Sequence, residues 1–233
     1  GDSYGGGQSL QLAFLRDRIR LPDGRFAPWR SPRGTRLSLT AAYPMIPWSD
    51  MRDALLPNGR EHGFGDPIGV PISSYVNGLL IAANLTGFVA PAGADPRADI
   101  STWKSYMDQG DPYGAKARAA LRAIGVYHGV TTLLGRRPAP LLLSSGWTDD
   151  LFPVAHTLRV YDVLRARNAD APVWLQYGDL GHQRGGAHAA DLAVLRTQAV
   201  AFFDHFLKRA RTALPPPGSI VAFGQSCPRD TPH

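Results

Sequence analysis

The feature that most constrains the fold of this chain is a G-x-S-x-G motif at its start, Gly1-Asp2-Ser3-Tyr4-Gly5. Such a motif is typical of a sharp turn from a strand into a helix, with the serine at the apex. The backbone there is closely packed, so the residues beside the serine must lack bulk, and glycine has no Cβ to clash. The turn would present Ser3 Oγ as a nucleophile. It would also direct the N–H of Tyr4 at a substrate oxygen that becomes negative, as in an oxyanion hole.

A serine in this turn predicts that an acid and a base follow it, in that order, each in a loop just after a strand of an α/β-hydrolase sheet. Two later segments meet that requirement. The apolar run 139–145 precedes Gly146-Trp147-Thr148-Asp149-Asp150, and the run 171–177 precedes Gly178-Asp179-Leu180-Gly181-His182. The sequence therefore predicts the α/β class, with His182 as the base and an aspartate of the first loop as the acid.

The apolar content and the charge of the chain limit the kinds of partner that it can bind. With 233 residues and 44% apolar content, the chain can bury a substantial core. The net charge of +6 could indicate nucleic-acid binding. The arginines near the start are, however, scattered among acidic residues and prolines and show no aromatic stacking pattern: Arg16, Arg18, Arg20, Arg25, Arg30, Arg33 and Arg36. We interpret them as a solvated basic surface and predict no nucleic-acid partner.

Other classes of site find little support. Cys227 is the only cysteine, so the chain can form no internal disulfide. No apolar run approaches the length of a membrane span. His188, together with His182 and Asp191, is a weak metal-site alternative, because the spacing is loose and no thiolate or carboxylate cluster accompanies it. We predict neither a metal nor a cofactor.

The order of apolar and turn-rich segments predicts four parts. Residues 1–50 would form the first part of the hydrolase core, with a helix over 5–16 and a strand over 37–42. Residues 51–137 read as an inserted, mostly helical cap, with helices over 75–85, 100–109 and 114–124. Residues 138–211 would complete the core. Residues 212–233 read as a proline-rich linker and the first strand of a C-terminal β domain. The chain opens inside its motif, so we expect the early strands of the fold to be missing.

Several further residues are candidates for the site. Asp50 is a rival for the acid, although it follows the wrong strand. Trp147 and Phe152 flank the acid loop and could form a pocket wall, or they could pack in the core. His128, at the exit of the predicted cap, could line the substrate pocket or be a structural histidine.

Three segments together resemble the X-prolyl dipeptidyl-peptidase and cocaine-esterase-like serine hydrolases. They are residues 1–6, Gly-Asp-Ser-Tyr-Gly-Gly, residues 146–153, Gly-Trp-Thr-Asp-Asp-Leu-Phe-Pro, and residues 178–182, Gly-Asp-Leu-Gly-His. The resemblance implies an α/β-hydrolase with a helical cap and a C-terminal β jelly roll, and it favours a secreted protein. It implies Ser3 as nucleophile, His182 as base and Asp149 as acid, because Gly146-x-x-Asp is the family's spacing. The second oxyanion donor of that family, a tyrosine before the serine motif, has no counterpart here.

The predicted activity is hydrolysis of an ester or amide bond through an acyl-enzyme. The resemblance covers both carboxylesterases and peptidases that release X-Pro dipeptides, and the residues do not choose between them. The predicted partner is a small ester, amide or peptide substrate. The alternative from another class is a catalytically silent binding or scaffold module that keeps the hydrolase fold.

Overall fold

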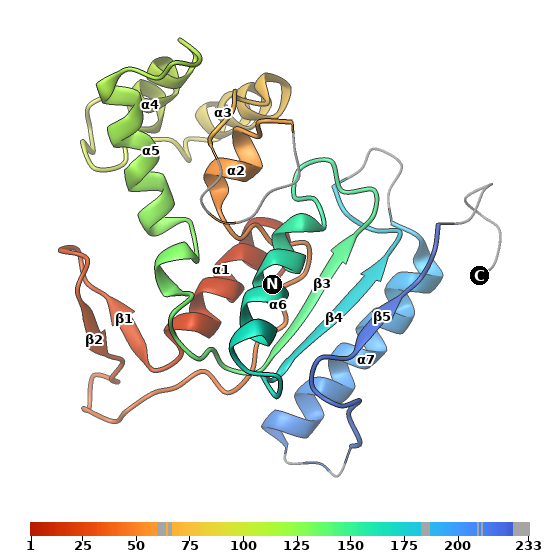
Figure 1. Cartoon of the computed structure of the whole chain (residues 1–233). Coiled ribbons are helices and arrows are strands. Elements are labelled where there is room, and N and C mark those ends of the chain that lie inside the picture. The colour runs from red at the N-terminus through yellow and green to blue at the C-terminus, as the bar shows by residue number, and fades with distance from the viewer. Residues whose placement is uncertain (60–63, 65–66, 183–186, 209, 211, 226–233) are drawn as a thin grey trace. The chain divides into compact units, whose positions relative to one another are not determined.

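The computed structural model describes residues 1–59, 64, 67–182, 187–208, 210 and 212–225. The chain is of mixed α/β type and forms two compact units (Figure 1). The first unit comprises Gly1–Ser49 and Val130–His233, and the second comprises Asp50–Gly129. The first unit contains the sheet together with Ser3, Tyr4, Asp149 and His182.

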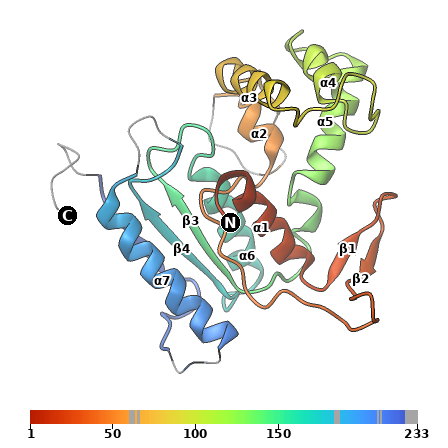
Figure 2. The ribbon, with the colours of Figure 1, turned by 180° about the vertical axis from the view of Figure 1, so that it is seen from behind.

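The sheet of the first unit is parallel, with the order β3-β4-β5. Its strands are β3 (Leu141–Gly146), β4 (Val173–Gly178) and β5 (Ile220–Ala222), and every residue of β3 and β4 is buried. The helix α6 (Ala155–Arg167) connects β3 to β4, and α7 (Ala189–Leu207) follows β4. The two helices cover opposite faces of the sheet (Figures 1 and 2). Burial on both faces explains why both strands read as continuous apolar runs in the sequence.

The segment 42–46 takes the place predicted for a strand over 37–42. It runs parallel to β3, with single bridges from Ala42 to Leu141 and from Met45 to Ser144. Pro44 lies within it and has no N–H to donate, although its carbonyl accepts a hydrogen bond from Ser144 N (3.0 Å). The pairing of this segment with β3 is therefore interrupted at Pro44. The paired residues also lie later in the chain than the predicted strand, at 42–46 instead of 37–42.

The helix α1 (Ser3–Leu15) confirms the predicted first helix. It begins directly after Asp2, which forms a parallel bridge to Met45 and so joins the same sheet edge. The antiparallel strands β1 (Arg18–Arg20) and β2 (Phe26–Pro28) follow α1 as a short hairpin. A 3₁₀ turn, η1 (Thr131–Leu133), leads toward β3.

The core on one face of the sheet is largely aromatic. The indole of Trp174 contacts the rings of Phe202 and Phe206 at centroid distances of 5.7 and 6.2 Å. Ala199 and Leu142 complete this cluster of buried side chains. The predicted final helix is thus confirmed as α7, and its apolar face holds β3 and β4 in place.

The C-terminal segment departs from its prediction. We expected residues 219–224 to open a separate β domain, but Ile220–Ala222 pair with Leu175–Tyr177 as the third strand of the same sheet. The proline-rich segment before β5 packs on the unit, since Trp174 Nε1 donates to the Pro215 carbonyl (2.9 Å). Cys227 lies outside the described residues.

The second unit is helical. It contains α2 (Met51–Leu55), α3 (Ser73–Leu85), α4 (Ile100–Met107) and α5 (Ala115–Tyr127), which confirms the three helices predicted within 75–124. The unit ends at Gly129, before the predicted boundary at 137. Val130, Leu133 and Leu134 are buried and belong to the first unit. Among the described residues, no helix is long and apolar enough to span a bilayer.

Candidate active site

Ser3 stands at a sharp reversal of the backbone. Asp2 is extended (φ −117°), whereas Ser3 has a φ of +53° and is the first residue of α1. Its N–H donates to the Met45 carbonyl (3.0 Å), which anchors the turn to the sheet edge. A positive φ is uncommon and strained for a residue with a Cβ, and such strain often marks functional sites.

The glycines around Ser3 differ in how tightly they are packed. A Cβ on Gly1 would lie 2.7 Å from the Gly5 carbonyl oxygen, one on Gly6 would lie 2.4 Å from the Met45 carbonyl oxygen, and one on Gly7 would lie 2.0 Å from the Trp48 ring. A Cβ on Gly5 would meet nothing within 4 Å. The expectation that both neighbours in the motif must lack bulk is therefore wrong for Gly5. The crowding falls on Gly1 and on the two glycines that follow the motif.

Tyr4, the candidate oxyanion donor, is the second residue of α1. Amides in the first turn of a helix point along its axis toward the positive end of the helix dipole, where a developing anion is stabilised. The Tyr4 carbonyl accepts a hydrogen bond from Trp48 Nε1 (3.2 Å), and the two rings lie 5.9 Å apart. Trp48, which is fully buried, thus holds the main chain of Tyr4 in place.

Asp149 lies in the loop that follows β3. Its carboxylate is completely buried, and its Oδ1 accepts hydrogen bonds from the backbone N–H groups of Leu151 (3.0 Å) and Phe152 (2.7 Å). These two donors orient the carboxylate. Asp150, the neighbouring alternative, is exposed to solvent.

His182 follows β4 and links the serine to the carboxylate. Its Nε2 lies 2.6 Å from Ser3 Oγ, and its Nδ1 lies 3.0 and 2.9 Å from the two oxygens of Asp149. The side chain is 17% exposed. The structure therefore brings Ser3, His182 and Asp149 into one continuous hydrogen-bonded chain, although they lie far apart in the sequence.

Two glycines allow the loops after β3 and β4 to approach each other. A Cβ on Gly146 would lie 1.5 Å from the Leu180 carbonyl oxygen. Gly181 has a φ of +136°, and a Cβ there would lie 2.6 Å from Asp149 Cβ. Both glycines belong to the loop motifs in the sequence, but this role was not predicted for them. The signal that could have indicated this role was a glycine directly before His182 and another at the end of β3, three residues before Asp149.

The predicted pocket residues have different surroundings. Phe152 is buried and packs the edge of its ring against His182, at a centroid distance of 4.8 Å. Trp147 is 43% exposed, contacts the Tyr177 ring and donates to the Phe223 carbonyl (2.6 Å). His128 belongs to the second unit, where it follows α5, and burial lowers the pKa of its imidazole. Their roles in a substrate pocket stay predictions.

His188 and Asp191, which were considered with His182 as a metal site, form hydrogen bonds with protein groups. His188 Nδ1 lies 3.0 Å from Asp191 Oδ1, and Asp191 Oδ2 accepts a hydrogen bond from Asp179 N (3.0 Å). The Asp179 side chain accepts a hydrogen bond from Thr148 Oγ1 (2.8 Å), which ties the loop after β4 to the loop after β3. Across the described residues, no group of three or more histidine, cysteine, aspartate or glutamate side chains could hold a metal ion.

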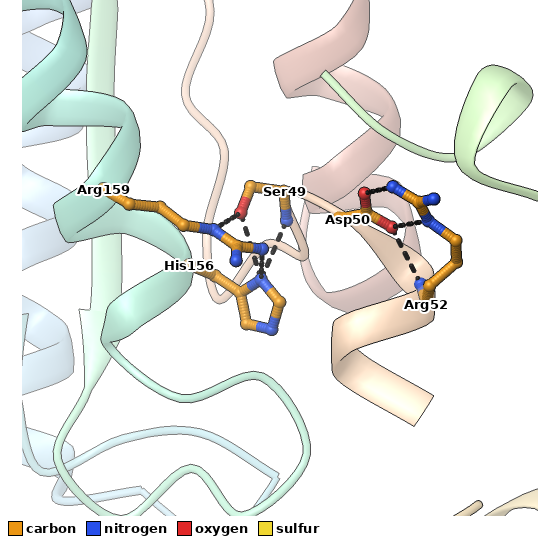
Figure 3. Close-up of polar contacts among 5 residues, drawn as sticks. All are labelled: Ser49, Asp50, Arg52, His156 and Arg159. Atoms are coloured by element: carbon orange, nitrogen blue, oxygen red, sulfur yellow. Dashed lines mark hydrogen bonds and ion pairs between the residues drawn. The ribbon is translucent and has the colours of Figure 1, made fainter. Parts of the chain in front are cut away.

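A second serine–histidine contact, which was not predicted from the sequence, lies in the first unit (Figure 3). His156, on α6, accepts hydrogen bonds at Nδ1 from Ser49 N (3.2 Å) and from Arg159 Nη2 (2.9 Å), and Ser49 Oγ lies 3.0 Å from the same nitrogen. All three residues are buried. Burial and the neighbouring guanidinium lower the pKa of His156 well below its usual value near 6.5. Its imidazole is therefore neutral, with Nδ1 as the acceptor.

Asp50, the rival acid, is part of the second unit. It is the N-cap of α2, and its Oδ1 accepts hydrogen bonds from Arg52 N (3.0 Å) and Arg52 Nε (2.9 Å) (Figure 3). The Asp50 carboxylate can be buried because the helix cap and the ion pair with Arg52 satisfy its oxygens. These contacts give Asp50 a structural role.

Comparison with known proteins gives the family. The model of the prolyl oligopeptidase family, peptidase S9, matches residues 82–210, which is more than half of the chain. The match includes Asp149 and His182 and leaves Ser3 outside its bounds. Neither the curated proteins nor the solved structures gave a match. The finer resemblance to X-prolyl dipeptidyl-peptidases and cocaine esterases stays a prediction. The chain belongs to the prolyl oligopeptidase family of serine hydrolases, within the α/β-hydrolase superfamily.

Proposed function

We propose that this chain hydrolyses ester or amide bonds through an acyl-enzyme, with Ser3 as nucleophile, His182 as general base and Asp149 as the orienting acid. The observation that carries the proposal is the unbroken series of contacts from Ser3 Oγ to His182 Nε2 (2.6 Å) and from His182 Nδ1 to Asp149 (2.9 Å). A buried carboxylate beside Nδ1 favours the tautomer that carries its proton there, which leaves Nε2 free to accept the serine proton.

In the first step, Ser3 Oγ attacks the substrate carbonyl while His182 Nε2 takes the hydroxyl proton. The imidazolium that forms is stabilised by the Asp149 carboxylate, which the N–H groups of Leu151 and Phe152 hold in position. His182 then returns the proton to the leaving alkoxide or amine. A water molecule deacylates Ser3 by the same sequence, with His182 again acting as base.

The negative oxygen of the tetrahedral intermediate would be stabilised by the N–H of Tyr4. The position of this group in the first turn of α1 supports that role, because the helix dipole adds to the hydrogen bond. Removing one oxyanion donor typically raises the barrier by about 3–4 kcal/mol.

The substrate class within this reaction is also a proposal. We propose small carboxylic esters as the primary substrates and X-Pro dipeptidyl amides as the second candidates. Assays with a p-nitrophenyl ester and with an Ala-Pro p-nitroanilide distinguish them. A higher kcat/KM on the p-nitroanilide would replace the first assignment with the second, and the roles of the three residues would not change.

Labelling with a fluorophosphonate probe tests the nucleophile directly. We expect the probe to label the wild-type chain and to leave Ser3→Ala unlabelled. Ser9→Ala is the matched control, because Ser9 lies on the same helix and, among the described residues, its hydroxyl donates to the Gly5 carbonyl (2.8 Å) and to no other group. An unlabelled wild-type chain would contradict the proposal and support the silent-module alternative. Label that persists in Ser3→Ala would also contradict it, because the reactive nucleophile would then be another residue.

A further inference from the structure

A hollow in the first unit lies away from Ser3. It is lined by the residues that follow α1 (Arg16, Asp17 and Arg18), by Arg36, Leu37 and Ser38, and by Gly135, Arg136 and Arg137, and its volume is about 620 Å³. We call it the arginine groove. The helix α1 begins at Ser3, and the groove starts just beyond its last residue, Leu15. Thirteen helical residues place the groove about 20 Å from the candidate active site.

The lining is strongly cationic, with five guanidinium groups and one carboxylate. Two of the arginines have structural contacts. Arg18 donates to the Phe14 (3.3 Å) and Leu15 (3.2 Å) carbonyls at the end of α1. Arg136 lies over the ring of Phe26, with its Cζ 4.3 Å from the ring centroid. These contacts fix two guanidinium groups in the wall of the groove.

The other three arginines, Arg16, Arg36 and Arg137, are exposed. Within the described part of the chain, their guanidinium groups form no ion pair and no side-chain hydrogen bond. Like charges gathered in this way repel each other and lower the stability of the fold, unless an anion neutralises them. Three separate segments of the chain contribute to the cluster, so it does not follow from a run of arginines in the sequence.

The chemistry of guanidinium groups selects the class of ligand. Each group offers a planar fork of N–H donors that matches the paired oxygens of a phosphate. The volume is that of a small-molecule site, and a second hollow of about 240 Å³ shares four of its lining residues and extends it along Phe26, Ala27 and Pro28. Phe26 already has Arg136 over its ring, so it is a poor platform for stacking nucleic-acid bases. We propose that the arginine groove binds a small anion that carries two or more phosphate groups.

Calorimetric titration with tripolyphosphate tests this proposal. The test variant is the double substitution Arg36→Gln with Arg137→Gln. Its matched control is Arg122→Gln with Arg167→Gln, which removes the same charge from exposed positions outside the groove. Because charge-assisted hydrogen bonds are lost only in the first variant, we expect its Kd to rise by roughly tenfold or more. The Kd of the control should rise by no more than about twofold. The far-UV circular dichroism spectrum and the urea unfolding curve of each variant verify that it is folded.

Three outcomes would overturn the proposal. The first is a titration of the wild-type chain that shows no heat of binding. The second is an equal loss of affinity in both variants, which would show that only the overall charge matters. The third is a short single-stranded oligonucleotide that binds more tightly than tripolyphosphate and depends on Arg36 and Arg137. That result would assign the groove to nucleic acid.

Discussion

Among the described residues of the first unit, two serine–histidine contacts differ in one partner. Ser3 and His182 are joined to a carboxylate, that of Asp149, whereas Ser49 and His156 are joined to a guanidinium, that of Arg159. Phe152 lies near both imidazoles, with its ring centroid 4.8 Å from His182 and 6.2 Å from His156. The two contacts thus share residue types and one aromatic neighbour.

The third partner decides what each imidazole can do. A carboxylate beside Nδ1 stabilises the imidazolium, so a histidine placed there can take a proton from serine. At His156, burial opposes protonation of the imidazole, and the Arg159 guanidinium that donates to Nδ1 opposes it further. We infer that Ser3–His182 is built for proton transfer and that Ser49–His156 is a structural contact that holds the segment before the second unit against α6.

The largest expected effect comes from removing the carboxylate at the first contact. Asp149→Asn should lower kcat on an ester substrate by about 10⁴-fold, because an amide favours the wrong tautomer of His182. The matched control is Asp150→Asn, an exposed neighbour that should change kcat by no more than about twofold. Equal losses of kcat in the two variants would contradict the assignment of Asp149, and not Asp150, as the partner of His182.

A smaller effect should follow from crowding the same carboxylate. Gly181→Ala would place a Cβ 2.6 Å from Asp149 Cβ, at a backbone φ of +136° that disfavours alanine. The displaced carboxylate should lower kcat by about 10²-fold, as small misplacements of catalytic groups do. Gly135→Ala, whose Cβ would meet nothing within 4 Å, is the control. The kcat of both variants is measured by steady-state kinetics. Full activity of Gly181→Ala would contradict the prediction.

Local signals in the sequence were sufficient for the candidate site. The serine motif, the glycine-flanked loops and the buried runs before them depend on residues that are neighbours in the chain, and strand ends of a parallel sheet meet at one edge. The approach of Asp149 to His182 could be predicted for this reason. The choice against Asp150 required the resemblance, because spacing alone does not say which of two adjacent side chains turns inward.

Features that arise from contacts between distant segments could not be predicted. His156 meets Ser49 across more than a hundred residues, and nothing near either residue marks the contact. Arg36 and Arg137 likewise gather in one groove from separate segments, so arginines that appear scattered in the sequence form a cluster in the fold. The pairing of β5 with β4 was missed because three residues after a proline-rich segment carry no indication of which sheet they join.

The contact between Ser49 and His156 should make the free energy of unfolding depend on pH in the acidic range. Burial lowers the pKa of His156 in the folded chain, so the unfolded chain, with a histidine pKa near 6.5, takes up the proton first. The stability due to neutral His156 is therefore complete above pH 6.5 and is lost as the pH falls below that value. The loss amounts to at most about 1.4 kcal/mol of unfolding free energy per pH unit.

The substitution His156→Gln should remove the loss of unfolding free energy that His156 causes below pH 6.5. Urea unfolding at a series of pH values would measure it as a shallower slope than that of the wild-type chain. Leu158→Gln, an exposed neighbour on α6, introduces the same side chain and should keep the wild-type slope. A wild-type slope in His156→Gln would show that this imidazole is not held neutral by the fold.

The smallest expected effect concerns Phe152, the ring that both imidazoles approach. Phe152→Leu should lower kcat by about three- to tenfold, because an edge-on aromatic contact contributes about 0.5–1.5 kcal/mol to holding His182. Phe203→Leu removes a comparable contact with Phe202 on α7 and should leave kcat unchanged. If Phe152 serves only the first contact, Phe152→Leu should also keep the acid-dependent slope of unfolding that His156→Gln removes. A loss of that slope in Phe152→Leu would instead mean that the ring keeps His156 buried as well, and the two contacts would then have to be treated as one coupled network.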